Sequence, residues 1–292
     1  MENLKLFVNP LNLEIKELLA TEDAYVNRKT KNLNSISILF NAFFNKNDLK
    51  KEHLNIIKAI KGFEAQTLMI DKILDNKKTN KIEMRIIVAF ILQSAMTGDF
   101  LNSLKNLGIG AEDQLKAMKE WNNVLKHVYF GEGLDVIYTE KDIKPLSLEE
   151  YLFMIKETTA IFFQLPLYLG CLVKGLNEAE TKKILDYGLN LGIAFQVKDD
   201  YEDLENDIEE GKQRIFVTKE ALDLLSGENR SYIKNTYRKN LKKDLEILSD
   251  PKIKNLIKEL NGKFVDKAIS SLNFLEGNHV KNLKEIAKLI KI

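Results

Sequence analysis

Apolar residues recur at three- and four-residue spacings along almost the whole chain, and this periodicity constrains the fold more than any other feature. Stretches such as "HLNIIKAIKGFEAQTLMIDKIL" and "IEMRIIVAFILQSAMTGDFLNSLKNL" follow the pattern of helices with an apolar face. Only 4 prolines and 14 glycines interrupt the pattern, and sustained two-residue alternation is missing. The sequence therefore predicts an all-α protein of roughly ten helices joined by short links.

Length and charge narrow the class of protein further. The chain has 292 residues, of which 45% are hydrophobic, so it can bury a large core. No Pro-, Gly- or Ser-rich linker and no repeat of fixed period divides it, so residues 1–292 are predicted to form a single domain. The net charge of +1 predicts that nucleic acid is not a partner, because no basic field would attract a phosphate backbone.

Cysteine usage and apolar runs predict a cytoplasmic location. Cys171 is the only cysteine, so an internal disulfide is excluded, and its apolar neighbours predict a buried, inert thiol. The first residues, "MENLKLFVNPLNLEIKELL", are interrupted by acidic and amide side chains and do not read as a signal peptide. The apolar runs are far shorter than the ~20 residues that a spanning helix needs, so stable membrane insertion is not expected.

Local signals predict where two of the helices begin. Ser147 with Glu150, and Asn177 with Glu180, have the spacing of a capping box, in which each side chain bonds the backbone of the other residue. Pro166 lies inside an apolar pattern that resumes at once, which predicts a kink rather than the end of a helix.

Three aspartates follow directly on an apolar helical stretch in "GIAFQVKDDYED". Asp199 and Asp203 are four residues apart, so a helix places them on one face, where their charges repel. Carboxylates beside a buried stretch are costly unless something pairs with them. A divalent cation fits, because Mg²⁺ takes oxygen ligands, usually one or two carboxylates plus phosphate oxygens and waters. The alternative is a helix that emerges into solvent with an acidic free face.

A second acidic pair repeats this spacing. Asp71 and Asp75, in "DKILD", also follow an apolar run, "TLMI". Two helices that face each other with acidic pairs would form a pocket that collects Mg²⁺ around a diphosphate. The alternative for this pair alone is an exposed face of mixed charge.

The stretch "GLNLGIAFQVKDDYEDL" resembles the second aspartate-rich motif of the trans-isoprenyl diphosphate synthases, the polyprenyl synthetase family. The matching residues are Gly188, Gly192, Phe195, Gln196, Asp199, Asp200 and Asp203. Further segments resemble the family in the same order along the chain: "GDFL", "GEGLDV", "YLFMIKETTAIFF" and "DIEEGK". The resemblance extends from about Tyr25 to Lys212.

This resemblance implies an isoprenoid synthase fold, in which helices surround a deep central cavity, and a chain-elongation reaction. Mg²⁺ held by both acidic motifs would bind an allylic diphosphate and draw off its diphosphate. The double bond of isopentenyl diphosphate would attack the allylic cation, and a proton would then be lost. The protein's contribution would be stabilisation of charge and exclusion of water.

The resemblance also implies roles for individual residues. Implied metal ligands are Asp71, Asp75, Asp199 and Asp203, and these four together with Asp200 are implied to be catalytic. Implied substrate-binding residues are Arg28, Lys29, Lys81, Thr159, Gln196 and Lys212. Gln66 and Thr67 stand one turn before the first motif, and neither is a large aromatic, which indicates a medium-length product such as farnesyl or geranylgeranyl diphosphate.

Several positions depart from the family pattern. Lys72 fills the second aspartate position of the first motif, Thr158 stands in place of a lysine, and Glu64 stands in place of a histidine. The N-terminal Gly-Lys-Arg is reduced to "NRKTK". Most of these changes fall on groups that hold diphosphates, especially isopentenyl diphosphate.

The departures leave three functional hypotheses. The first is an active prenyl diphosphate synthase, with allylic and isopentenyl diphosphates as substrates and Mg²⁺ as cofactor. The second is a non-catalytic or regulatory subunit that pairs with an active paralogue. The third keeps the metal-diphosphate chemistry but cyclises one allylic diphosphate or uses another acceptor. The family also implies a homodimer, or a heterodimer in the second case.

Overall fold

The structure is a computed structural model that describes residues 36–45, 48–75, 82–140, 145–210 and 214–292, apart from some side chains within the helices. Every regular element among these residues is helical, which confirms the predicted all-α class. Contacts within the chain group it into two compact units, Met1–Leu115 and Lys116–Ile292. That residues 1–292 form a single domain stays a prediction.

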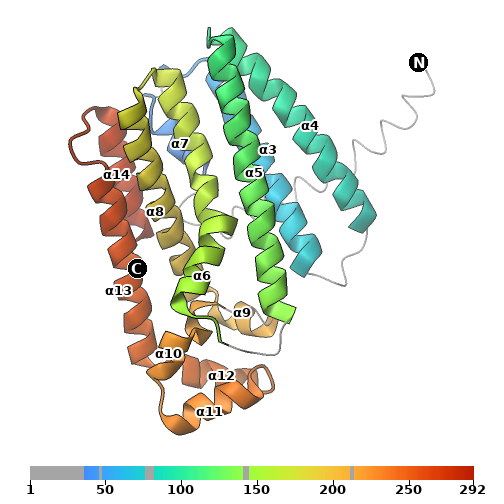
Figure 1. The fold of residues 1–292 in the computed structure, drawn as a ribbon, viewed down its shortest axis with the longest axis vertical. Coiled ribbons are helices and arrows are strands. Elements are labelled where there is room, and N and C mark those ends of the chain that lie inside the picture. The colour runs from blue at the N-terminus through green and yellow to red at the C-terminus, as the bar shows by residue number, and fades with distance from the viewer. Residues whose placement is uncertain (1–35, 46–47, 76–81, 141–144, 211–213) are drawn as a thin grey trace. The chain divides into compact units, whose positions relative to one another are not determined.

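The helices have the following bounds (Figure 1). In chain order they are α2 (Ser37–Asn41), α3 (Lys51–Asp75), α4 (Ile82–Asn106), α5 (Ala111–Glu140), α6 (Leu148–Ile155), the π-helical turn η2 (Lys156–Ala160), α7 (Ile161–Lys174), α8 (Glu178–Glu202), α9 (Leu204–Glu210), the 3₁₀ turn η3 (Ile215–Val217), α10 (Lys219–Asp223), α11 (Gly227–Thr236), α12 (Leu241–Leu248), α13 (Pro251–Ser271) and α14 (Asn278–Ile290).

In the first unit, α3 and α4 lie side by side and α2 contacts α3 (Figure 1). The apolar spacing of α3 produces this packing: Ile56, Ile60 and Phe63 occupy one face and are fully buried. Phe100 and Leu104, four residues apart on α4, are also fully buried. The apolar faces predicted from the sequence are therefore buried where the helices of this unit pack together.

The second unit is organised around α8. One side of α8 packs on η2 and α7, another side packs on α13, and α14 also contacts it. Figure 1 shows α7, α8, α13 and α14 running alongside one another, while α9 to α12 gather at one end of this unit. Neighbouring helices cover α8 from several directions, so polar residues such as Asp200 are buried along with the apolar ones. Buried polar groups need hydrogen-bond partners.

Two buried polar side chains tie α8 to the C-terminal helices. The hydroxyl of Tyr187 donates to the carbonyl of Leu283 at 2.6 Å. The amide of Asn261 donates to the carbonyl of Ala194 at 2.8 Å and accepts from the N–H of Ile292 at 3.0 Å. These bonds connect α13 and α14 to the helix that carries the second aspartate motif.

The predicted caps are present. Ser147 with Glu150, and Asn177 with Glu180, each form both bonds of a capping box. Pro166 lies inside α7, which continues to Lys174, so the helix does not stop there. The π-helical turn η2 (Lys156–Ala160) lies about two turns before this proline. How far the helix bends at Pro166 stays a prediction.

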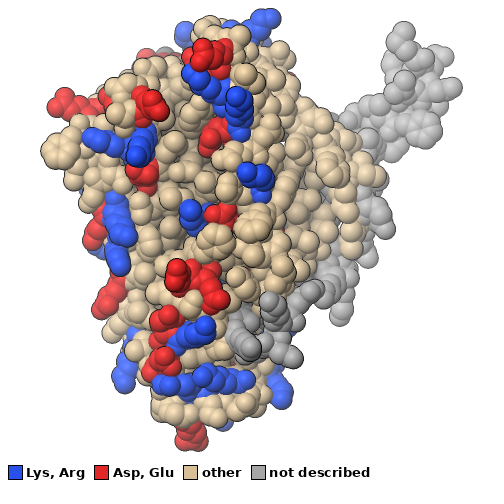
Figure 2. Space-filling view, viewed as in Figure 1, with Lys and Arg blue, Asp and Glu red and all other residues tan. Residues whose placement is uncertain are grey.

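The outer surface carries mixed charge. Figure 2 shows lysine and arginine interspersed with aspartate and glutamate on the visible face of the described residues. In the basic stretch around α12, Lys242 and Lys243 are exposed, whereas Asp244 is buried and accepts from the backbone N–H of Arg238 at 2.7 Å. Among the described residues, no helix is long and apolar enough to span a membrane.

We expect Cys171 to resist alkylation in the folded protein. The side chain is 1% exposed in α7, and burial raises the pKa of its thiol to about 12. A raised thiol pKa means less reactive thiolate below that pH, so the native labelling rate at pH 8 should fall roughly a thousandfold below that of the unfolded chain. Labelling with a thiol-reactive dye, with and without denaturant, measures this ratio. Rapid native labelling would contradict the burial.

Candidate functional site

One face of α8 packs against η2 and α7. Gly188, Gly192, Gln196 and Asp200 recur every four residues and lie on this face. A Cβ added at Gly192 would stand 2.5 Å from the Cα of Ala160, and one at Gly188 would meet Leu167 at the same distance. At Gly192 only glycine allows so close an approach, because the obstructing atom is backbone, whereas at Gly188 it is the end of the Leu167 side chain, which can move. The glycine spacing of the motif therefore sets how near η2 lies to Gln196.

Gln196 bonds the two sides of this interface. Its Oε1 accepts from the hydroxyl of Thr159 at 2.7 Å, and its Nε2 donates to Asp200 at 2.7 Å and to Asp199 at 3.4 Å. The side-chain amide is thus fixed at both ends. The structure brings together two of the predicted substrate-binding residues, Thr159 and Gln196, and joins them to the aspartate motif.

Asp200 faces the protein interior and is 1% exposed. Its Oδ2 accepts from the hydroxyl of Tyr151 at 2.6 Å, and its Oδ1 accepts from Gln196 and lies 3.9 Å from Nε of Arg214. Burial raises the pKa of Asp200, while the Arg214 charge and the two donors oppose the rise. Asp200 therefore sits on the packing side of α8; its predicted catalytic role stays a prediction.

Arg214 lies among three carboxylates. Its guanidinium forms a two-point contact with Asp135, at 2.7 Å and 3.1 Å, and its Nε lies 3.9 Å from both Asp200 and Asp207. Burial alone would lower the pKa of Arg214, but these carboxylates raise it well above its usual value. Arg214 therefore stays charged and joins α5, α8 and α9.

Asp199 lies in the last turn of α8, and Asp203 is the residue that follows its end. The backbone N–H of Asp203 donates to the carbonyl of Asp199 at 2.9 Å, and Asp203 caps the helix. Both side chains are partly exposed, unlike Asp200. Two carboxylates one turn apart suit Mg²⁺, which commonly takes one or two protein carboxylates and completes its shell with phosphates and water. Among the described residues, no group of three or more His, Cys, Asp or Glu is placed to hold a metal.

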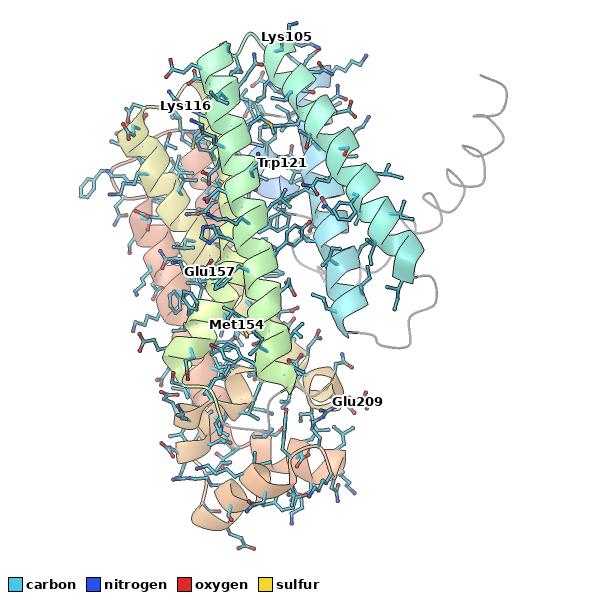
Figure 3. All side chains as sticks on the ribbon, turned by 45° about the vertical axis from the view of Figure 1, so that its right-hand side comes forward. Lys105, Lys116, Trp121, Met154, Glu157 and Glu209 are labelled. Atoms are coloured by element: carbon cyan, nitrogen blue, oxygen red, sulfur yellow. The ribbon has the colours of Figure 1, made fainter. Side chains whose placement is uncertain are left out.

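The face of α5 that meets η2 also carries functional groups. His127, Gly131 and Asp135 recur every four residues along it. His127 pairs with the buried Glu157, and Gly131 lies against the backbone of Thr158. Figure 3 shows Glu157 and Met154 on successive turns beside α5. This face of α5 therefore contacts η2 through His127 and Gly131.

The first motif lies at the end of α3. Asp71, Lys72 and Asp75 fall in its last turns, but their side chains lie outside the described part of the structure. Earlier on the same helix, Glu64 and Gln66 are buried, and Gln66 donates to Gln93 of α4 at 3.2 Å. The roles of Asp71 and Asp75 as metal ligands stay predictions.

Four predicted substrate-binding residues lie outside the described residues: Arg28, Lys29, Lys81 and Lys212. The structure adds three residues that the sequence did not mark as site residues, namely Tyr151, Asp135 and Arg214. Tyr151 and Asp135 stand within segments that resemble the family. Arg214 carries no comparable signal, because its partner Asp135 lies 79 residues away.

Comparison with known proteins identifies the class. A profile of the family described as polyprenyl synthetase matches residues 16–248, which is most of the chain. This protein belongs to the polyprenyl synthetase family, as the aspartate motif indicated. Among its relatives are two archaeal geranylgeranyl diphosphate synthases. The one from Saccharolobus solfataricus is 29% identical over 70% of this chain and 68% of its own length. The one from Sulfolobus acidocaldarius is 28% identical over 74% and 72%.

Solved structures agree on the fold. Geranylgeranyl pyrophosphate synthetase from the archaeon Geoglobus acetivorans superposes with a TM-score of 0.72 at 21% identity, covering 100% of this chain and 98% of its own. Geranylgeranyl pyrophosphate synthase from Corynebacterium glutamicum, solved with isoprenyl diphosphate and magnesium, superposes with a TM-score of 0.73 at 17% identity, covering 96% of each chain. The predicted isoprenoid synthase fold is confirmed.

Proposed function

We propose that the protein is a cytoplasmic, Mg²⁺-dependent prenyltransferase that condenses an allylic diphosphate with isopentenyl diphosphate to a longer trans-prenyl diphosphate. The observation that carries this proposal is the arrangement of Thr159, Gln196 and Asp199, joined by hydrogen bonds at the end of α8. Family membership supports it, and the named activities of the archaeal relatives agree with it.

The residues of α8 would divide the work. Asp199 and Asp203 would hold Mg²⁺, which when bound would offset the charge of the departing diphosphate. Gln196 would keep the Asp199 carboxylate oriented, because a metal ligand binds best when a second hydrogen bond fixes it. The apolar part of the substrate would lie along aromatic side chains such as Phe195, which packs against Phe163 with ring centroids 5.3 Å apart.

The product is proposed to be of medium length, farnesyl or geranylgeranyl diphosphate. In α3, Gln66 and Thr67 occupy the region one turn before the first motif, and neither side chain is a large aromatic. The hydroxyl of Thr67 donates to the carbonyl of Glu64 at 2.9 Å, so it is held against its own helix. The relatives from Saccharolobus and Sulfolobus carry the name geranylgeranyl diphosphate synthase.

The test is condensation by the purified protein alone. It would be incubated with Mg²⁺, radiolabelled isopentenyl diphosphate and, in turn, dimethylallyl, geranyl and farnesyl diphosphate, with product length read by chromatography. We expect a labelled prenyl diphosphate that disappears when EDTA removes the metal. Absence of product with every allylic primer would exclude an autonomous synthase.

A second candidate is a non-catalytic or regulatory subunit that pairs with an active paralogue. The observation that favours it is Thr158, which carries no charge where the resemblance places a lysine, and whose hydroxyl donates to the carbonyl of Met154 at 3.2 Å. In that case activity should change only when a synthase from the same source is added. Release of diphosphate without isopentenyl diphosphate would instead indicate a cyclase or another acceptor.

A further inference from the structure

Arg214 holds three helices together from a position just before η3. The Nη1 and Nη2 edge of its guanidinium contacts Asp135 of α5, which leaves its Nε directed at Asp200 of α8 and Asp207 of α9. The side chain of Arg214 is 13% exposed and that of Asp200 is 1% exposed, so water screens this contact weakly. A fixed guanidinium fork suits a contact of this kind better than a flexible ammonium group would.

A chain of contacts leads from Arg214 to the candidate metal ligand. Arg214 faces Oδ1 of Asp200, the same oxygen that accepts the Nε2 proton of Gln196 at 2.7 Å. Gln196 offers the other side of that Nε2 to Asp199 at 3.4 Å. If the Asp200 carboxylate shifted, the Gln196 amide would turn with it. The Nε2 group that donates to Asp199 would then move.

We propose that Arg214, braced by Asp135, is a positioning residue for the diphosphate site: it fixes Asp200 and Gln196 so that Asp199 is presented for metal binding. This inference rests on the proposed function, because it takes Asp199 to be a metal ligand. Arg214 acts through other residues and does not itself touch the substrate. The alternative is a purely structural role, in which Arg214 only compensates the buried charge of Asp135.

The two roles predict different results in a double variant. In Arg214→Gln, the buried Asp135 loses its partner, so the protein should be destabilised under either role. In Arg214→Gln combined with Asp135→Asn, both members of the ion pair are neutral, so much of the stability should return. Under the structural role, function returns with stability; under the positioning role, it does not, because Asp200 still lacks Arg214.

The experiment measures binding of inorganic diphosphate by isothermal titration calorimetry in excess Mg²⁺, together with thermal melting. We expect the folded double variant to bind diphosphate about 10- to 100-fold more weakly than wild type, the usual cost of removing support from a metal ligand. Arg214→Lys keeps the charge but loses the guanidinium fork, so its affinity for diphosphate should lie between those of wild type and the double variant. Arg230→Gln is the matched control, since Arg230 of α11 pairs with Asp223 of α10 at 3.0 Å.

The positioning role would be overturned if the double variant bound diphosphate with wild-type affinity. It would also be overturned if the separate variants Arg214→Lys and Arg214→Gln both did so. If Arg214→Gln does not fold, the double variant and the lysine variant still decide the matter. A different result would contradict the proposed function itself. In that case wild type and Asp199→Ala would bind diphosphate equally, or binding would survive EDTA.

Discussion

Replacing Asp199 by alanine is expected to lower kcat/KM for prenyl transfer by roughly 100- to 1000-fold, the range seen when one electrostatic stabiliser is removed from an active site. Asp199 is the partly exposed carboxylate of α8 that receives the Nε2 proton of Gln196. Its loss leaves Asp203, the C-cap of α8, as the one predicted ligand of the second motif, so the Mg²⁺ concentration needed for half-maximal rate should rise. Steady-state kinetics over a series of Mg²⁺ concentrations measures both effects.

The control for this variant is Asp186→Ala. Asp186 is also an aspartate of α8, it is exposed, and it lies away from the network around Gln196. We expect wild-type kinetics from it and a melting temperature close to wild type from both variants, because each removed side chain reaches solvent. If Asp199→Ala kept its kcat/KM and its response to Mg²⁺, the metal-binding role of α8 would be wrong.

Gly131→Ala is expected to destabilise the second unit by about 1–3 kcal/mol, the cost of forcing extra atoms into a packed interior. A Cβ at Gly131 would stand 2.5 Å from the backbone N of Thr158 and 2.7 Å from the backbone C of Glu157. Backbone atoms cannot rotate away, so η2 must shift, and Thr159 moves with it. Thermal denaturation should show a fall of about 2–4 °C for each kcal/mol.

Gly133→Ala provides a control on the same helix. A Cβ at Gly133 would meet nothing within 4 Å, so the change tests helix propensity alone. Alanine is favoured over glycine in a helix by about 1 kcal/mol, so this variant should melt at or above the wild-type temperature. Equal destabilisation of both variants would mean that the close approach of α5 to η2 is not what Gly131 provides.

Local features of the fold were predicted correctly from the sequence. The two capping boxes formed as expected, because each depends on residues three apart and on little else. The burial of Ile56, Ile60 and Phe63 follows in the same way from their helical spacing. The irregular turn η2 was not predicted, since its composition, "KETTA", does not distinguish a π-helical turn from an ordinary one.

The site was predicted in part. The sequence placed Gln196 and Asp199 on one helix, as the structure does, whereas Asp203 lies just past the end of that helix as its C-cap. The sequence did not reveal that Asp200 turns inward to Tyr151, because a helix sends adjacent residues in directions about 100° apart and the spacing alone does not say which direction is buried. The four residues Arg28, Lys29, Lys81 and Lys212 remain predictions.

By itself, the sequence determined the helical class, two helix starts and the family, since periodicity, caps and a compact motif are all recorded in residues close together along the chain. Only the tertiary structure decided what surrounds that motif. The contact of Arg214 with Asp135 and Asp200 joins segments far apart in the chain, and such a contact exists only once packing has excluded water and brought α5 and α8 together. That Asp200 turns inward, toward Tyr151 and Arg214, was likewise decided by packing, which no local pattern records.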